Sequence, residues 1–195
     1  GRGRGGDIFV TATDDITLTG TTRDGFSGGI LTLSERGANG SAGNITIRAS
    51  DFRIANGAIV VASTFNRGEG GDIEINADNF EVVNGGQVVT NTRSRGDAGT
   101  ITLNIRDNAI LSGIDSDFQN RRERARQYTK RSSITDRVSD IIGNQGSSSG
   151  LFANTSPESS GRGGAISLNA DNLSLTDRAT ISARSQGEGI AGNIR

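Results

Sequence analysis

Short runs of alternating apolar and polar residues recur along this chain. The clearest run covers residues 73–77, where isoleucine, isoleucine and alanine alternate with glutamate and asparagine. Such alternation is typical of a β-strand that buries one face. A turn signal at residues 78–79 (Asp-Asn) separates this run from a second over 80–82, and residues 84–86 (Asn-Gly-Gly) separate the second from a third over 87–92. The pattern therefore predicts three short strands joined by turns.

The same three-strand pattern repeats with a fixed period. One isoleucine begins each repeat, and the intervals between the six isoleucines are 37, 28, 28, 65 and 28 residues. This is a period of 28 residues with two insertions, of 9 and 37 residues. If the repeats stack in register, these isoleucines form one continuous buried row. The row comprises Ile8, Ile45, Ile73, Ile101, Ile166 and Ile194.

The remaining inward positions follow from the alternation within each repeat. Together they predict a narrow aliphatic core repeated along an axis, in keeping with a chain that is 32% hydrophobic and only 4% aromatic. They are Val10, Ile16, Leu18, Leu31 and Leu33 in the first repeat, Ile47, Phe52, Ile54, Val60 and Ala62 in the second, Leu103, Ile110, Leu151 and Ala153 in the fourth, and Leu168, Leu173, Leu175, Ile181 and Ala183 in the fifth.

The tetrapeptide Gly-x-[Gly/Ala]-Gly precedes each isoleucine of the row. A corner between stacked strands must turn sharply, so a positive φ or a missing Cβ is required at equivalent places in every repeat. The middle position alternates between glycine and alanine, which indicates room for one methyl group and no more. We therefore predict that the outer glycines of each tetrapeptide are structural corners. They are Gly3, Gly6, Gly40, Gly43, Gly68, Gly71, Gly96, Gly99, Gly161, Gly164, Gly189 and Gly192.

A fixed period of this length predicts stacked supersecondary units, not one closed globule. We predict an all-β fold, a right-handed parallel β-helix (solenoid) with about 28 residues and three short strands per coil and one long insertion. Residues 1–195 then form a fragment of one such domain, five coils plus the start of a sixth. A leucine-rich repeat is disfavoured because its motif and helical half are missing, and a calcium-binding roll because no ladder of carboxylates follows the glycines.

Composition narrows the chemistry that this chain could perform. It has 29 glycines and one proline, and it lacks Cys, Met, His and Trp. Disulfides, thiolate metal sites and triads that use His or Cys are therefore excluded, and we predict no metal, no cofactor and no catalysis. A net charge of −1 gives no indication of nucleic-acid binding, and no apolar run is long enough for membrane insertion. The missing initiator methionine predicts a segment of a longer array.

The longer insertion, residues 114–149, is locally basic and forms either a loop or short helices. Residues 117–131 lack alternation and predict a short helix with Asp117 as its N-cap. Four apolar residues spaced i, i+4, i+7 and i+8 from Ile134 to Ile142 predict a second amphipathic turn laid against the coil. Arginine pairs with carboxylate or phosphate in a bidentate manner, so the basic run is a candidate site for a polyanion or partner; the alternative is a solvated charged face. The candidate residues are Arg121, Arg122, Arg124, Arg126, Lys130 and Arg131.

The full repeat reads G-x-[GA]-G-x-I-x-[ILV]-x-A, then D-N-[FL]-x-[LV], then A-x-I-x-A, as in residues 163–175 and 179–183. This motif resembles the repeats of the filamentous-haemagglutinin-like exoproteins of cyanobacteria, large surface or secreted proteins of the two-partner secretion type. The resemblance covers the whole chain except the insertion. It implies export through an Omp85-type outer-membrane transporter, a place outside or on the outer surface of a Gram-negative-type bacterium, and a role as an adhesive or structural stalk.

A different hypothesis is a β-helical lyase or hydrolase that acts on carbohydrate. The catalytic carboxylates of such enzymes lie on one outward sheet, so two acids within ~5–10 Å of each other that face a groove would favour this class. The predicted outward rows supply few acids, and the recurring Asp78, Asp107 and Asp171 fit turns. The outward residues are Phe9, Thr46, Glu74, Thr102 and Ser167 on the first strand, and Thr17, Arg53, Glu81, Ala109 or a neighbour, and Ser174 on the second.

We expect a non-enzymatic structural or adhesive segment of a large secreted or cell-surface protein. Its expected partners are acidic polysaccharide or other cell-surface glycans and, for the full-length protein, the Omp85-type transporter, with no nucleic acid and no membrane insertion. A third hypothesis is a subunit of a self-assembling filament or surface layer, because open sheet edges invite pairing between copies.

Overall fold

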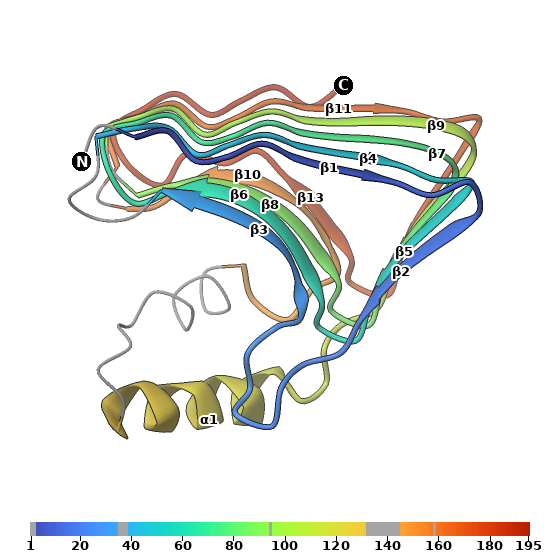
Figure 1. The fold of residues 1–195 in the computed structure, drawn as a ribbon, viewed down its shortest axis with the longest axis horizontal. Coiled ribbons are helices and arrows are strands. Elements are labelled where there is room, and N and C mark those ends of the chain that lie inside the picture. Colours follow the sequence, from blue (N-terminus) through green and yellow to red (C-terminus); the bar gives the residue numbers. More distant parts are fainter. Residues whose placement is uncertain (1–2, 35–38, 94, 132–144, 158) are drawn as a thin grey trace.

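The computed structural model describes residues 3–34, 39–93, 95–131, 145–157 and 159–195 (Figure 1). Apolar and β-branched residues dominate its strands, because such side chains pack well on a pleated, half-buried surface. The strands are β1 (Ile8–Thr11), β2 (Asp15–Thr19), β3 (Gly29–Ser34), β4 (Ile45–Arg48), β5 (Asp51–Ala55), β6 (Ile59–Thr64), β7 (Ile73–Val83), β8 (Gln87–Thr92), β9 (Ile101–Ser112), β10 (Gly150–Thr155), β11 (Ile166–Asn169), β12 (Asn172–Thr176) and β13 (Thr180–Ser182), and the helix is α1 (Phe118–Arg131).

The strands form two parallel sheets that enclose one core. The eight-stranded sheet contains β1, β2, β4, β5, β7, β9, β11 and β12, and the five-stranded sheet has the order β13-β10-β8-β6-β3. Strands inside each sheet pair with their equivalents in the preceding and following passes of the chain, as β4 does with β1 and β7. The eight-stranded sheet bends, so that β1 and β4 lie on one limb and β2 and β5 on the other (Figure 1).

The predicted fold class is wrong. We expected an all-β right-handed parallel β-helix with three short strands per coil, whereas the structure has two parallel sheets and a 14-residue α-helix. Two predicted turns do not break their strands: β7 runs from Ile73 to Val83 and β9 from Ile101 to Ser112. A register shift between Ala77 and Asn79 lies in this stretch. Because such a bulge bends a strand without ending its pairing, the first two predicted strands belong to one sheet.

The predicted row of isoleucines is confirmed. The four inner members of the row are fully buried, and burial of each contributes roughly 1.5–3 kcal/mol to stability. The same register stacks Phe52 on Phe80, with ring centroids 5.7 Å apart. Backbone pairing joins the members of the row in the order Ile8, Ile45, Ile73, Ile101, Ile166 and Ile194.

In the second half of β9, after the register shift, the inward positions differ by one residue from those predicted. The register shift places Ala109 and Leu111 opposite the inward Phe80 and Val82 of β7, and both are buried. Ile110, which we expected to face inward, instead lies opposite Glu81 and is 40% exposed. Side chains of a strand alternate between its faces, so one extra residue reverses every assignment after it.

The third strand of the first repeat shows the same kind of error. We expected Leu31 and Leu33 to face the core between the sheets, but Ile30 packs against that core and Thr32 pairs with its inward Ala62. Leu31 and Leu33 pack instead against a second apolar cluster on the outer face of the five-stranded sheet. The sequence around β3 is apolar at three of four positions, so its alternation is ambiguous.

This second apolar cluster was not predicted. It lies on the outer face of the five-stranded sheet, where β6, β8 and β10 are buried at every position. Strands buried on both faces lose the alternation that marks a half-exposed strand. The helix α1 lies on this side of the molecule (Figure 1). The cluster comprises Ile59, Val61, Phe65, Val89 and Phe152.

The predicted corner glycines lie where the chain returns from the five-stranded to the eight-stranded sheet. None of the glycines named above has a positive φ, so the missing Cβ is what the corner requires. A Cβ on Gly43 would collide with the carbonyl oxygen of Gly6, whereas one on Gly6 would meet no atom within 4 Å. Gly3 is as open as Gly6, since a Cβ on it would also meet nothing within 4 Å. The collision recurs at Gly40, Gly68, Gly71, Gly96, Gly99, Gly161, Gly164, Gly189 and Gly192.

The helix predicted within the insertion is confirmed, and α1 begins one residue after Asp117. The larger part of the 9-residue insertion lies at residues 20–28, where Thr21 and Ser27 form an antiparallel bridge. These two excursions meet: the Phe26 ring contacts that of Tyr128 edge-on, with centroids 5.6 Å apart. The predicted second amphipathic turn, with Ile134, Val138, Ile141 and Ile142, lies outside the described residues.

Candidate functional site

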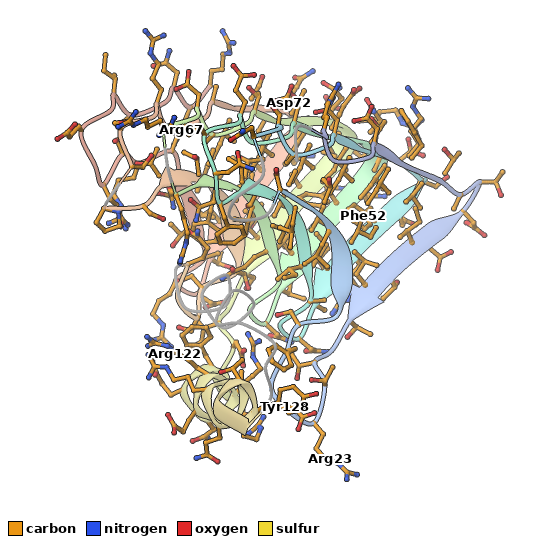
Figure 2. All side chains as sticks on the ribbon, turned by 60° about the vertical axis from the view of Figure 1, so that its left-hand side comes forward. Arg23, Phe52, Arg67, Asp72, Arg122 and Tyr128 are labelled. Carbon is orange, nitrogen blue, oxygen red and sulfur yellow. The ribbon has the colours of Figure 1, made fainter. Side chains whose placement is uncertain are left out.

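A hollow of about 540 Å³ crosses the outer face of β2, β5, β7 and β9, and we call it the outer groove. Its volume falls within the range of small-ligand sites. Two outward side chains from each strand form its walls, and Phe52 lies beneath it in the core (Figure 2). The outward side chains that line it are Asp15, Thr17, Asp51, Arg53, Asn79, Glu81, Asn108 and Ile110, and the inward Ile16, Phe52 and Phe80 also line it.

The first wall is a row of aspartate and asparagine residues, one from each strand, that we call the Asx row. The Asn79 amide donates a 2.8 Å hydrogen bond to an Asp51 carboxylate oxygen, and the Asn108 amide donates a 3.0 Å bond to the Asn79 oxygen. Asn172 of β12 extends the row with a 3.3 Å bond to Asn108. Backbone pairing places Asp15 directly opposite Asp51 at the other end. The row therefore begins with two carboxylates and continues with amides.

The second wall changes character from strand to strand. Thr17 supplies a hydroxyl group, and Arg53 forms an ion pair with Glu81 of the neighbouring strand. The side chains of this pair are 41% and 36% exposed, so both remain accessible to a ligand. Ile110 ends the wall with an apolar surface. The groove thus combines hydroxyl, guanidinium, carboxylate and amide groups with apolar contacts from Ile110, Ile16, Phe52 and Phe80.

This set of groups suits a ligand rich in hydroxyl groups. Carboxylates and amide oxygens accept hydrogen bonds, and guanidinium and amide nitrogens donate them, so both roles of a sugar hydroxyl can be met. The lining carries the carboxylates of Asp15, Asp51 and Glu81 against the single cation of Arg53, which is already paired. Among the described residues, no group of three or more His, Cys, Asp or Glu side chains is placed to hold a metal ion.

The groove also contains two neighbouring acids, which is the arrangement that would favour a carbohydrate-cleaving enzyme. Asp15 and Asp51 are outward residues on neighbouring paired strands, and both line the groove. Neighbouring strands lie about 4.8 Å apart, a spacing close to the shortest carboxyl separation used by glycoside hydrolases, about 5 Å. The sequence-based reasoning missed this pair because it considered other outward positions of these strands.

The arginines of the basic run in the insertion lie in different environments. Arg121 is buried: its guanidinium lies 2.7 Å from the Asp115 carboxylate and donates to the Gly25 carbonyl at 3.2 Å and the Ser27 hydroxyl at 3.1 Å. It also lies over the Phe118 ring. Its charge is therefore used to join α1 to the hairpin at residues 20–28.

Arg124 is exposed and paired. Its guanidinium lies 2.8 Å from the carboxylate of Asp117, the residue before the helix. Hydrogen bonds from Arg124 and then from Asn120 lower the pKa of the Asp117 carboxyl below its ordinary value. Asp117 was predicted as the N-cap of this helix. In the structure its carboxylate accepts hydrogen bonds from the side chains of Arg124 and Asn120.

Arg122 and Arg126 lie along one edge of α1, because residues four apart share a side of a helix. In the described part of the chain neither of them forms an ion pair. Figure 2 shows Arg122 and Tyr128 on opposite sides of the helix. Lys130 and Arg131 belong to its last turn. Of the predicted residues whose side chains the structure describes, Arg121 is buried, Arg124 is paired with Asp117, and only Arg122 and Arg126 lie together along one edge of α1.

Comparison with protein-family models, with curated proteins and with solved structures finds no match to this chain. The resemblance to filamentous-haemagglutinin-like exoproteins therefore rests on the repeat motif alone. Within the described ranges, no helix has the length and apolarity needed to cross a membrane.

Proposed function

We propose that this chain is a non-enzymatic structural or adhesive segment of a large secreted or cell-surface protein, and that it binds glycan in the outer groove. The observation that carries the proposal is the groove itself, a hollow that spans four paired strands and is lined by both polar and apolar side chains. The repeat motif adds the setting: the outer surface of a Gram-negative-type bacterium, reached by the full-length protein through an Omp85-type transporter.

The stacking of the chain supports a structural role. The isoleucine row and the Asx row each repeat one side-chain contact from pass to pass, so every added pass is held by the same interactions as the last. Repeated contacts of this kind hold the strands of the two parallel sheets together. A regular outer face on such a sheet offers a ligand many equivalent weak contacts.

A glycan-binding panel tests the proposal. Oligosaccharides of several classes are titrated by calorimetry against the wild-type chain, the Arg53→Gln variant and the matched control Arg106→Gln. Arg106 also pairs with an acid, Asp78 at 2.7 Å, but does not line the outer groove. Loss of the Arg53 charge-assisted hydrogen bonds is expected to weaken binding at least about tenfold, and the control should change it less than about twofold. Failure of every glycan to bind, or equal binding by all three proteins, would contradict the proposal.

A second candidate function is hydrolysis or lyase cleavage of carbohydrate, favoured by the Asp15 and Asp51 pair that faces the groove. The test is the release of new chain ends from each bound glycan over time. Turnover that disappears in Asp51→Asn while binding persists would establish the enzyme and overturn the non-enzymatic proposal. Binding without release of ends supports the proposal as stated.

The basic edge of α1 supplies a separate route to acidic polysaccharide. Arg122 and Arg126 are the described cations of the run that no acid in the described residues neutralises. Arginine at exposed positions pairs well with carboxylate or sulfate. We expect Arg122→Gln with Arg126→Gln to weaken binding of a sulfated polysaccharide several-fold and to leave binding in the outer groove unchanged.

A further inference from the structure

We infer that the outer groove takes a linear glycan of neutral or amino sugars, laid across the strands with about one sugar unit per strand, and discriminates against uronic or sulfated glycans. This inference rests on the proposed function and specifies its ligand. It follows from the direction of the groove, from the charges of its lining and from the pairing that those charges already have.

The direction of the groove follows from its lining. Each of β2, β5, β7 and β9 contributes one residue of the Asx row and one residue of the second wall. Parallel strands are about 4.8 Å apart, so the groove extends roughly 14 Å across the three intervals. One pyranose unit of an extended glycan is similar in length to one strand spacing. A linear chain laid along the groove therefore meets an equivalent pair of side chains at each successive sugar.

The charges select among such glycans. In the described residues, Glu81 is neutralised by Arg53, whereas Asp15 and Asp51 form no ion pair. The Asn79 amide donates to Asp51 and leaves that carboxylate with further acceptor capacity. An anionic sugar placed beside these two carboxylates would be repelled, and a protonated amino sugar would be attracted. Hydroxyl groups of neutral sugars can donate to both acids.

The Asx row itself provides a conservative variant. Asparagine already occupies the equivalent positions on β7, β9 and β12, where it forms the cross-strand hydrogen bonds of the row. Asp15→Asn combined with Asp51→Asn therefore removes two charges while extending an arrangement that this fold already uses. Asp171→Asn is the matched control, because Asp171 is an exposed acid that does not line the groove.

The experiment compares three oligosaccharides of equal length: one of glucosamine, one of neutral glucose and one of galacturonate. Each competes with a labelled neutral oligosaccharide, so that only ligands in the groove are counted and anion binding at α1 is not. For the wild type and for Asp171→Asn, we expect the amino-sugar chain to bind about tenfold more tightly than the galacturonate chain, with the neutral chain between them. The double variant should bind all three within about twofold.

The possible outcomes separate this inference from the proposed function. Preference for galacturonate in the wild type, or an unchanged preference in the double variant, would overturn the inference and leave glycan binding intact. If the labelled neutral oligosaccharide does not bind at all, both the inference and the proposed function are wrong. A circular-dichroism melt of each variant establishes that the comparison is made between folded proteins.

Discussion

The outer faces of the two sheets differ although the same stacking builds both. On the five-stranded sheet, outward Ile59, Val61 and Val89 join a buried apolar cluster, and β6, β8 and β10 have no exposed residue. On the eight-stranded sheet, outward positions carry Asp, Asn, Arg, Glu and Thr, and strands such as β4 and β9 alternate between buried and more exposed residues. Backbone pairing sets the register of both sheets, but the outward side chains decide which face is covered and which is open to a ligand.

The largest expected effect comes from placing a charge on each outer face. Val61 is fully buried, so Val61→Asp would bury an unpaired carboxylate and should lower the free energy of unfolding by about 4 kcal/mol or more. Ser174 is an exposed outward residue of β12, and Ser174→Asp should change it by less than about 0.5 kcal/mol. Urea denaturation measures both. Equal effects would mean that the two faces do not differ in burial as described.

A second comparison uses one arginine from each side. Arg121 and Asp115 have side chains only 5% and 11% exposed, so Arg121→Ala leaves a buried carboxylate unpaired and should cost about 3–5 kcal/mol. The Arg53–Glu81 pair lies in the open groove, and Arg53→Ala should cost at most about 1 kcal/mol. Thermal melting of the two variants tests this order. A larger loss for Arg53→Ala would show that the joint between the two excursions contributes little to stability.

A third comparison concerns the corner that joins the two sheets. A Cβ at Gly71 would overlap the carbonyl group of Gly43, so Gly71→Ala should destabilise the protein by about 1–3 kcal/mol. Gly6 occupies the same place in the repeat but has open space around it, and Gly6→Ala should cost less than about 0.5 kcal/mol. The denaturation midpoints of the Gly71→Ala and Gly6→Ala variants measure this difference. If both substitutions are tolerated equally, close approach of successive passes is not the reason for these glycines.

The smallest expected effect is electrostatic and lies on the exposed side of α1. Because Arg124 lowers the pKa of Asp117, this pair stabilises the fold above the ordinary pKa of the carboxyl, and its contribution is lost as the pH falls through the lowered value. Arg124→Gln should raise the pKa of Asp117 towards that of an unperturbed aspartate. A carbon-detected NMR titration of the carboxyl measures this shift. An unchanged pKa would show that Arg124 does not act on Asp117 in solution.

Much of the stacking was predictable from the sequence, because it follows from local periodicity. The isoleucine row and its register were predicted from spacing and alternation, and the helix after Asp117 from the lack of alternation and the N-cap signal. The groove was not predicted, although its signal was present: Asp15, Asp51, Asn79, Asn108 and Asn172 recur one position before each second strand's first inward residue. Each of these residues is common in turns, so each was interpreted as a turn residue, and the row that they form together was not predicted.

The remaining errors arose where the local sequence pattern fits two different assignments of inward and outward residues or of strand ends. Around Ile110 one extra residue in β9 reverses the faces, and the sequence does not mark where the extra residue is absorbed. In β3 and β6, apolar residues on both faces remove the alternation that would identify the inward side. The number of strands per repeat was misjudged for a related reason, since β7 continues through the turn signal at residues 78–79, and the extra residue at this register shift lies in β9.

By itself the sequence determined the period, the buried row and the corners, because each depends on residues close together or repeated at a constant interval. Only the tertiary structure decided that the two excursions meet through Arg121, Phe26 and Tyr128. It likewise decided that one outer face is covered while the other keeps an open groove. Those features depend on contacts between segments that no constant spacing links, and such contacts are set by which surfaces the folded chain brings together.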